Sequence, residues 1–252
     1  MKLANQVAIV TGAGYGIGKQ YACALAKEGA SVAVADIVFD AAKSSAEVIN
    51  SSMSADKALA LHVDVSDESS TDEMARKVIE RFGRVDILVN NAGIYAELDR
   101  KPWTEISERE WDRIMQVNVK GCFLCAKAVF PQMKKQGRGK IINISSSTIW
   151  SPPLGRLHYV SSKAAVLGFT RALAREVGDY GINVNAITPG LTKSERAVKV
   201  SDEYYDQRAS MRAIKRVEVP NDLVGTVIFL ASSDSDFITG QTINVDGGYA
   251  FH

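Results

Sequence analysis

The fold of this chain is decided by residues 11–18, which read TGAGYGIG. An apolar run at 7–10 comes directly before this stretch, and a helical pattern near 17–28 follows it. Between a strand and a helix, glycines permit a tight turn and let the backbone approach a pyrophosphate at the helix N-terminus. A turn with a purely structural role could have a similar sequence. The strand before the loop and the helix after it favour nucleotide binding. The stretch predicts a nucleotide-binding loop, in which five residues would contact the cofactor: Gly12, Tyr15, Gly16, Ile17 and Gly18.

The rest of the chain repeats this alternation of strand and helix. Short apolar, β-branched runs predict further strands at 31–35, 58–63, 87–89, 140–144, 183–187 and 242–245. Further helical patterns lie near 38–52, 70–82, 107–134, 157–179 and 220–233. Runs that are apolar without alternation suit strands buried on both faces, as in a parallel sheet. We therefore expect an α/β fold, a doubly wound (Rossmann) parallel sheet of about seven strands with helices on both faces.

One domain accounts for the whole chain, residues 1–252, and combines dinucleotide binding with catalysis. No linker rich in Pro, Gly or Ser divides it, and no repeat is visible. The least regular stretch is 191–219, which mixes Glu, Lys, Arg and Tyr and has no strand signal. Because it follows the end of a predicted strand, we expect it to form a lid over the substrate.

Composition excludes several classes of protein. The 252 residues carry 30 Lys+Arg against 29 Asp+Glu, a net charge of +1 that argues against a nucleic-acid binder. No apolar run is long enough to span a membrane, and no secretory signal is visible, so a cytoplasmic protein is expected. Three cysteines and three histidines, with no ligand spacing among the histidines, predict neither a disulfide framework nor a metal site. The balanced charge fits an uncharged substrate.

The second predicted strand ends at Asp36, 18 residues beyond Gly18. A carboxylate there can accept hydrogen bonds from the adenosine ribose hydroxyls and would repel a 2′-phosphate. Ile37 follows it, and Tyr15 stands where an arginine could otherwise bind that phosphate. The predicted cofactor is NAD rather than NADP.

Tyr159 and Lys163 stand four residues apart on a predicted helix, so both side chains lie on one face. A nearby ammonium favours the phenolate and would lower the pKa of the phenol. Tyr159 could then take a proton from an alcohol while hydride leaves its carbon. Tyr15 and Lys19 have the same spacing, but only Tyr159 follows a serine cluster, residues 145–147, at the end of a predicted strand.

Taken together, these motifs resemble the short-chain dehydrogenase/reductase family from end to end. The matching residues are the glycine loop, Asn90-Asn91-Ala92-Gly93, Asn118, Ser146 thirteen residues before Tyr159, Lys163, Pro189-Gly190, and Val245-Asp246-Gly247-Gly248 near the C-terminus. Ser147 adjoins Ser146, so the assignment of the serine rests on spacing. Ser194 stands where the family often has threonine.

The resemblance implies a role for each matching residue. Tyr159 would be the general acid and base, Ser146 would hydrogen-bond the substrate oxygen, and Lys163 would hold the nicotinamide ribose. Asn118 would position a water that relays protons. Further cofactor contacts would come from Ile37, Asp64, Val65, Asn91 and Thr192.

Substrate identity would lie in the loops, where Tyr95, Trp150 and His158 are candidate lining residues. The resemblance is strongest to NAD-dependent dehydrogenases of aryl or cyclic alcohols, which implies oxidation of a hydrophobic secondary alcohol to a ketone. A 3-oxoacyl-[acyl-carrier-protein] reductase shares every motif and is the first alternative; a sugar or polyol dehydrogenase is the second. A nucleotide-sensing regulator on the same fold commonly lacks the tyrosine that this chain keeps. The family is usually a homotetramer, built through its long helices and C-terminal strand.

Overall fold

The computed structural model describes residues 1–53, 56–95, 98–195 and 200–251. Seven parallel strands form one sheet in the order β3-β2-β1-β4-β5-β6-β7. Their bounds are β1 Val7–Thr11, β2 Ser31–Asp36, β3 Ala58–His62, β4 Ile87–Asn90, β5 Gly139–Ile144, β6 Ile182–Pro189 and β7 Thr242–Val245. The doubly wound α/β fold expected from the sequence is confirmed, and all seven predicted strands are present.

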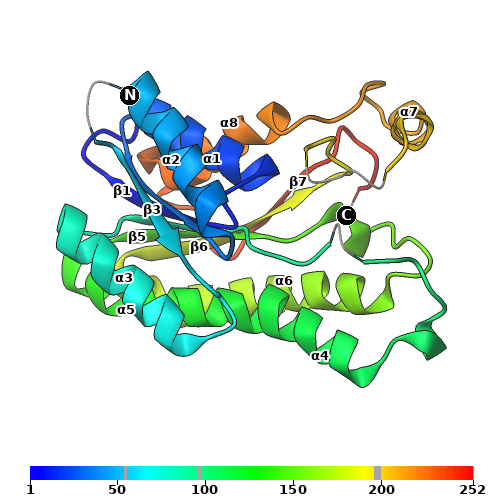
Figure 1. The fold of residues 1–252 in the computed structure, drawn as a ribbon, viewed down its shortest axis with the longest axis horizontal. Coiled ribbons are helices and arrows are strands. Elements are labelled where there is room, and N and C mark those ends of the chain that lie inside the picture. Colours follow the sequence, from blue (N-terminus) through cyan, green and yellow to red (C-terminus); the bar gives the residue numbers. More distant parts are fainter. Residues whose placement is uncertain (54–55, 96–97, 196–199, 252) are drawn as a thin grey trace.

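Helices cover both faces of the sheet (Figure 1). One layer contains α1 (Gly16–Lys27), α2 (Phe39–Ser52) and α8 (Asn221–Ala231), and the other contains α3 (Glu68–Phe82), α4 (Glu108–Met115), α5 (Gly121–Gln136) and α6 (Leu157–Val177). Successive residues of a strand point to opposite faces, so Ala8 and Val10 pack under the first layer while Ile9 packs under the second. Both faces are therefore buried, which is why the strands are apolar without alternation.

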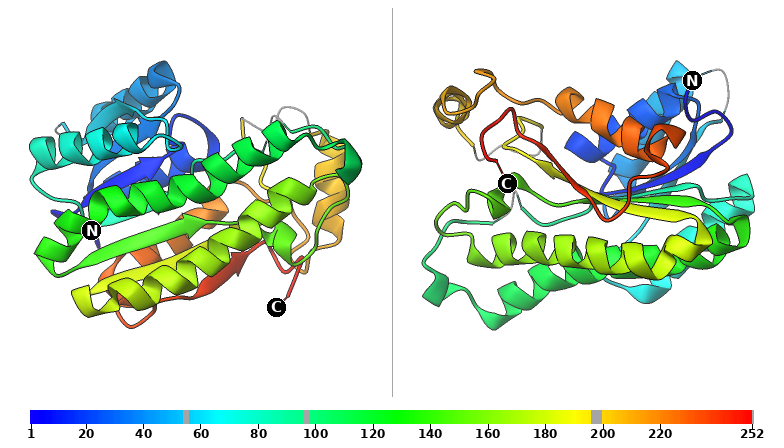
Figure 2. Two further views of the ribbon diagram at one scale, coloured as in Figure 1. Left: turned by 90° about the horizontal axis from the view of Figure 1, so that it is seen from below. Right: turned by 180° about the vertical axis from the view of Figure 1, so that it is seen from behind.

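Two segments differ from the expected helices. The single helix expected at 107–134 is interrupted by a π-helical stretch, Gln116–Lys120, between α4 and α5. The expected lid, 191–219, contains a short helix, α7 (Asp202–Ser210), and residues 196–199 within it lie outside the described part. Ser201 begins α7 because its side chain accepts a hydrogen bond from the Tyr204 N–H. The views from below and behind place α7 at the same end of the molecule as the C-terminus (Figure 2).

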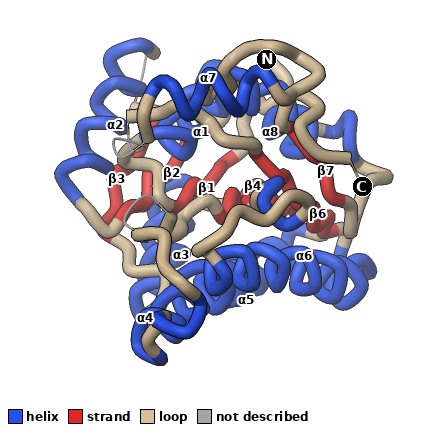
Figure 3. Tube along the Cα trace, turned by 90° about the vertical axis from the view of Figure 1, so that its right-hand side faces the viewer, coloured by secondary structure: helices blue, strands red, loops and turns tan. Residues whose placement is uncertain are grey.

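All parallel strands point the same way, so their carboxyl ends form one edge of the sheet. The strand order reverses direction between β1 and β4, which is where ligands bind in folds of this kind. Viewed along the sheet, the loops that follow the strands gather at this edge between the two helical layers (Figure 3). No helix within the described ranges is long and apolar enough to cross a membrane.

Candidate active site

The loop between β1 and α1 is shaped by glycines that no other residue could replace without strain. Gly12 has a φ of 63°, and a Cβ there would lie 2.8 Å from the Ala92 Cα. A Cβ on Gly18 would lie 2.2 Å from the Gly12 carbonyl oxygen. The loop thus leaves backbone exposed along a groove lined by Gly12, Tyr15, Gly16, Ile17 and Gly18.

A carboxylate already occupies the N-terminus of α1. The Gly16 N–H, in the first turn, donates to Glu195 Oε1 at 2.9 Å, although Glu195 belongs to the lid. Free N–H groups and the helix dipole favour negative charge at this position. The carboxylate stands in for an anionic ligand, so the loop fits the pyrophosphate that its sequence predicts.

Asp36 ends β2 and lines the same groove. Its carboxylate accepts hydrogen bonds from the Gly14 N–H at 2.8 Å and the Val38 N–H at 2.9 Å, which fix its orientation. A carboxylate oxygen can accept more than one hydrogen bond, so capacity remains for ribose hydroxyls. Ile37 and Val38, which also line the groove beside it, are apolar.

The ends of β1 and β4 are joined by hydrogen bonds at the floor of the groove. The Asn91 side chain donates to the carbonyl oxygens of Thr11 and Gly12, both at 3.0 Å. Asp64 and Val65 form the far wall, and Asp64 Oδ1 accepts from the Ser66 hydroxyl at 2.6 Å. All the cofactor contacts expected in the loops after β1 to β4 therefore line one groove.

A second cleft adjoins the groove and holds the expected catalytic residues. It is lined by Ser146, Tyr159, Lys163 and Thr192, while Asn91 and Tyr95 line both spaces. Ser146 follows β5, and Tyr159 and Lys163 lie one turn apart on α6. The Ser146 hydroxyl is close enough to the Tyr159 phenol to influence its pKa.

Burial is the main cause of the pKa shifts of Tyr159 and Lys163 on α6. It raises the pKa of the Tyr159 phenol, and the Ser146 hydroxyl opposes that shift only in part. Burial also lowers the pKa of Lys163, whose Nζ donates to the Ile144 carbonyl oxygen at 2.8 Å. Lys163 Nζ lies 6.0 Å from the centre of the Tyr159 ring. The expectation that the ammonium lowers the pKa of the phenol is therefore wrong for the ligand-free protein, because desolvation dominates.

Asn118 lies in the π-helical stretch and is fully buried. Its Oδ1 accepts from the Ile94 N–H at 2.8 Å, and its Nδ2 donates to Ser162 Oγ at 3.0 Å. A Cβ on Gly93 would lie 3.2 Å from Asn118 Oδ1 and 3.4 Å from Lys163 Nζ, so both polar groups approach the same backbone. A π-helical turn commonly marks a functional site, and this one places the Asn118 amide beside Gly93, which Lys163 also approaches.

The three expected substrate residues are separated by the structure. Tyr95 lines the cleft, and its ring centre lies 4.9 Å from that of Tyr159. Trp150 is half-buried and does not line the cleft. His158 on α6 is fully buried, and its Nε2 lies 3.1 Å from Oε1 of Glu110 on α4. On the helix, His158 and Tyr159 point in different directions because adjacent residues are about 100° apart.

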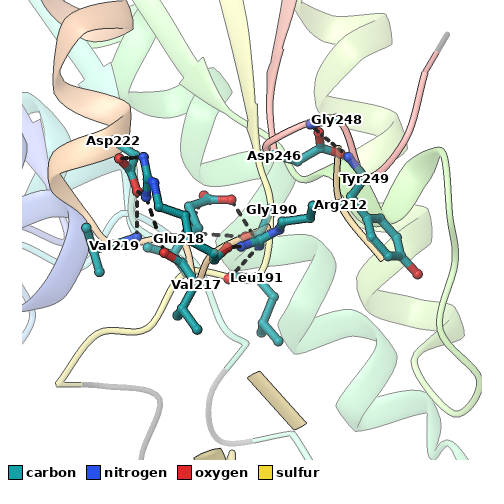
Figure 4. Close-up of polar contacts among 12 residues, drawn as sticks. Gly190, Leu191, Arg212, Val217, Glu218, Val219, Asp222, Asp246, Gly248 and Tyr249 are labelled. Atoms are coloured by element: carbon teal, nitrogen blue, oxygen red, sulfur yellow. Dashed lines mark hydrogen bonds and ion pairs between the residues drawn. The ribbon is translucent and has the colours of Figure 1, made fainter. Parts of the chain in front are cut away.

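A buried ion pair, which the sequence analysis missed, closes the base of the lid (Figure 4). Arg212 and Glu218 are 3% and 4% exposed, and Arg212 Nη2 lies 3.2 Å from Glu218 Oε2. Glu218 Oε1 accepts from the Thr192 hydroxyl at 2.7 Å, and Arg212 also donates to the Leu191 carbonyl oxygen. The pair therefore fixes Thr192, one of the expected cofactor contacts. In the sequence, the only indication of this ion pair is that residues of opposite charge, Arg212 and Glu218, stand close together in the irregular segment 191–219.

Comparison with known proteins gives one consistent family. A family model described as enoyl-(acyl carrier protein) reductase matches residues 12–250. The chain is 39% identical over 246 residues to the 3-oxoacyl-[acyl-carrier-protein] reductase FabG of Staphylococcus epidermidis, covering 97% of this chain and 98% of that protein.

A second relative and a solved structure are similar over nearly the whole chain. The chain is 40% identical over 249 residues, 98% of either chain, to the (2S)-[(R)-hydroxy(phenyl)methyl]succinyl-CoA dehydrogenase subunit BbsD of Thauera aromatica. The crystal structure of a 3-ketoacyl-(acyl-carrier-protein) reductase from Brucella melitensis complexed with NADH superposes with a TM-score of 0.90 at 32% identity, covering 99% of this chain and 100% of that chain.

Proposed function

The chain belongs to the short-chain dehydrogenase/reductase family, and we propose that it transfers hydride between NAD and a secondary alcohol, giving the ketone. That it is an oxidoreductase of this family follows from the similarity along its whole length. The observation that carries the proposal is that Ser146, Tyr159 and Lys163 line one cleft, which shares lining residues with the dinucleotide groove.

NAD is favoured over NADP by the side chain that ends β2. Asp36 presents a carboxylate to the groove, flanked there by the apolar Ile37 and Val38. A 2′-phosphate would meet this negative charge, whereas ribose hydroxyls would donate to it. The similar structure from Brucella melitensis contains NADH. When bound, the nicotinamide supplies or accepts the hydride.

The protein's own residues handle the proton and the substrate oxygen. Ser146 donates a hydrogen bond to that oxygen and Tyr159 exchanges a proton with it, which stabilises charge as it develops. Lys163 Nζ donates to the Ile144 carbonyl oxygen, and Asn118 Oδ1 accepts from the Ile94 N–H. We propose that they hold the ribose and a relaying water, respectively. Hydrophobic lining by Ile94, Tyr95 and Leu191 favours a substrate with an apolar body.

The decisive experiment is a matched panel of substrates with both cofactors. Aryl, cyclic, aliphatic and polyol alcohols are offered with NAD and NADP, and the corresponding ketones with NADH and NADPH. We expect NAD-dependent oxidation of at least one secondary alcohol, reduced by about 100-fold or more in Tyr159→Phe. Failure of every member, with NAD binding retained, would contradict the proposed reaction.

A 3-oxoacyl-[acyl-carrier-protein] reductase is the second candidate. The similarity to FabG supports it as well as it supports the first reading. An acyl-carrier 3-ketone with NADPH belongs in the same panel. If its reduction were faster than any NAD-dependent alcohol oxidation, the second candidate would replace the first.

A further inference from the structure

Three arginines line the catalytic cleft, each from a different segment of the chain. Arg100 follows β4, Arg156 precedes α6, and Arg208 lies on α7 in the lid. The near-zero charge of the whole chain conceals this local excess, because the three positions are far apart in the sequence. With Lys163, four basic residues line this cleft, and no Asp or Glu is found among its described lining residues.

Each guanidinium lies against a tyrosine ring. The distance from the arginine Cζ to the ring centre is 5.1 Å for Arg100 on Tyr204, 4.8 Å for Arg156 on Tyr95 and 3.8 Å for Arg208 on Tyr249. Such stacking holds the planar group in place without neutralising its charge.

Most of the hydrogen-bond donors of these arginines have no protein acceptor within the described ranges. Arg100 donates to the Tyr204 hydroxyl at 2.9 Å and Arg156 to the Tyr95 carbonyl oxygen at 2.9 Å. Arg208 donates to the Tyr249 hydroxyl. A guanidinium has five N–H donors, so each of the three retains several. None of these contacts involves a carboxylate.

We infer that the substrate carries an anionic group, a carboxylate or a phosphate, that these arginines bind. The inference rests on the proposed function, since it names the substrate class of the same cleft. Oriented guanidiniums with spare donors match carboxylate and phosphate oxygens, often with two hydrogen bonds at once. An uncharged alcohol would bring no counter-charge to these three cations, and the described lining of the cleft supplies none.

Contacts with the reacting centre distinguish Arg156 from the other two arginines. The Tyr95 ring contacts both Arg156 and Tyr159, and the charge of Arg156 acts on the Tyr159 phenol. Arg156 would therefore bind an anionic group close to the carbonyl carbon, as in a keto acid. Arg100 and Arg208 are joined to lid residues and residues near the C-terminus, so they would bind a more remote group, such as the phosphates of a coenzyme A thioester.

Three substrates with the same carbonyl group test the inference: acetoacetate, its neutral methyl ester, and acetoacetyl-CoA. The specificity constant for each is measured with NADH, in wild type and in Arg100→Gln, Arg156→Gln and Arg208→Gln. Arg171→Gln is the matched control, because Arg171 is exposed on α6 and does not line the cleft. Calorimetric titration of acetoacetate and of the methyl ester into the NAD-saturated protein measures binding without turnover.

We expect at least one anionic substrate to exceed the methyl ester by about 10-fold or more, as one charge-assisted hydrogen bond implies. Arg156→Gln should remove that preference for acetoacetate; Arg100→Gln and Arg208→Gln should remove it for acetoacetyl-CoA; Arg171→Gln should leave it unchanged. The pattern of losses identifies carboxylate or phosphate as the group.

Equal use of the methyl ester, or loss of neutral and anionic activity to the same extent in the arginine variants, would overturn the inference. In that case the arginines would serve to join the loops and nothing more. Failure of the proposed function gives a different result: no substrate is turned over with either cofactor, while the calorimetric preference for acetoacetate can still be measured.

Discussion

Tyr159 is the residue on which the proposed chemistry depends. Its phenol is buried, which raises its pKa, so in the ligand-free protein it is a proton donor rather than a base. Replacing it with phenylalanine preserves the ring and its packing against Tyr95 but removes the proton. We expect turnover to fall by about 100-fold or more, as loss of a general acid or base implies, with NAD affinity nearly unchanged.

Steady-state kinetics of alcohol oxidation across the pH range checks this expectation. In wild type the rate should rise with pH above neutrality, since a raised pKa delays formation of the phenolate. The Phe variant should lose this rise. Turnover close to that of wild type would remove Tyr159 from its role.

Asp36 decides cofactor choice through one carboxylate. Asp36→Ala removes both the acceptor for ribose hydroxyls and the negative charge that opposes a 2′-phosphate. We expect the KM for NAD to rise and the preference for NAD over NADP to shrink by about 10-fold, a hydrogen bond to a charged group being worth about 1.5–3 kcal/mol. Parallel assays with the two cofactors measure the ratio; an unchanged ratio would rule out the ribose contact.

Individual residues could be predicted from the sequence where a motif fixes their spacing. Tyr159, Lys163 and Ser146 lie together because strand ends and helix faces have regular geometry. Trp150 and His158 could not be placed, since one residue along a helix or loop changes the direction of a side chain completely. The cleft arginines carry no local motif, and only the fold shows that they meet.

Among the elements, the lid forms contacts that compete with the cofactor. Glu195 occupies the N-terminus of α1, where a pyrophosphate is expected to bind. In Glu195→Gln the competing negative charge is lost, while the size of the side chain is kept. We expect the Kd for NAD, measured by fluorescence titration, to fall several-fold. Glu203→Gln on α7 is a control with the same change of charge; an equal effect there would point to general electrostatics instead.

The contribution of Glu218, at the base of the lid, to the stability of the protein should depend on pH. Burial raises the pKa of this carboxyl from 4.5 to about 7, although Arg212 opposes the shift; Asp246 also raises it. Tyr21 and Arg216 are the other titratable groups influenced by its charge. A pKa raised by folding contributes stability that is complete below pH 4.5 and lost as the pH rises through 7.

Urea unfolding of wild type and Glu218→Gln between pH 4.5 and 8 measures this contribution. As the pH rises across that range, wild type should lose stability relative to Glu218→Gln. The difference in the free energy of unfolding between the two proteins should change by at most about 3 kcal/mol. A constant difference would show that Glu218 is ionised throughout, held by Arg212.

The sequence predicted the strands well because burial on both faces leaves an unmistakable apolar run. It was less informative about helices. The π-helical stretch that contains Asn118 interrupts a long helix, and no proline or glycine comes before it to indicate the interruption. Helix α7 buries only Tyr205 and Ala209, one turn apart, which is too little apolar periodicity to stand out within the lid.

At the scale of the whole molecule, two of the places where apolar side chains are exposed are suited to association between chains. Phe123 on α5 is 48% exposed, in the helical layer that also contains α6. Strand β7 is an edge of the sheet, and Phe237 and Phe251 on either side of it are exposed. An open edge strand and exposed aromatic residues are features that proteins cover by association.

Two such faces on one chain allow two different twofold contacts, and two intersecting twofold axes generate a tetramer. We therefore expect sedimentation equilibrium to give the mass of four chains. Phe123→Glu places a charge in one of the two contacts and should halve that mass, leaving dimers joined through β7. Val48→Glu is the matched control, since Val48 on α2 is 47% exposed in the opposite layer and should leave the tetramer intact. A monomeric wild type, or a tetramer that survives Phe123→Glu, would mean that the α5 face is not an interface.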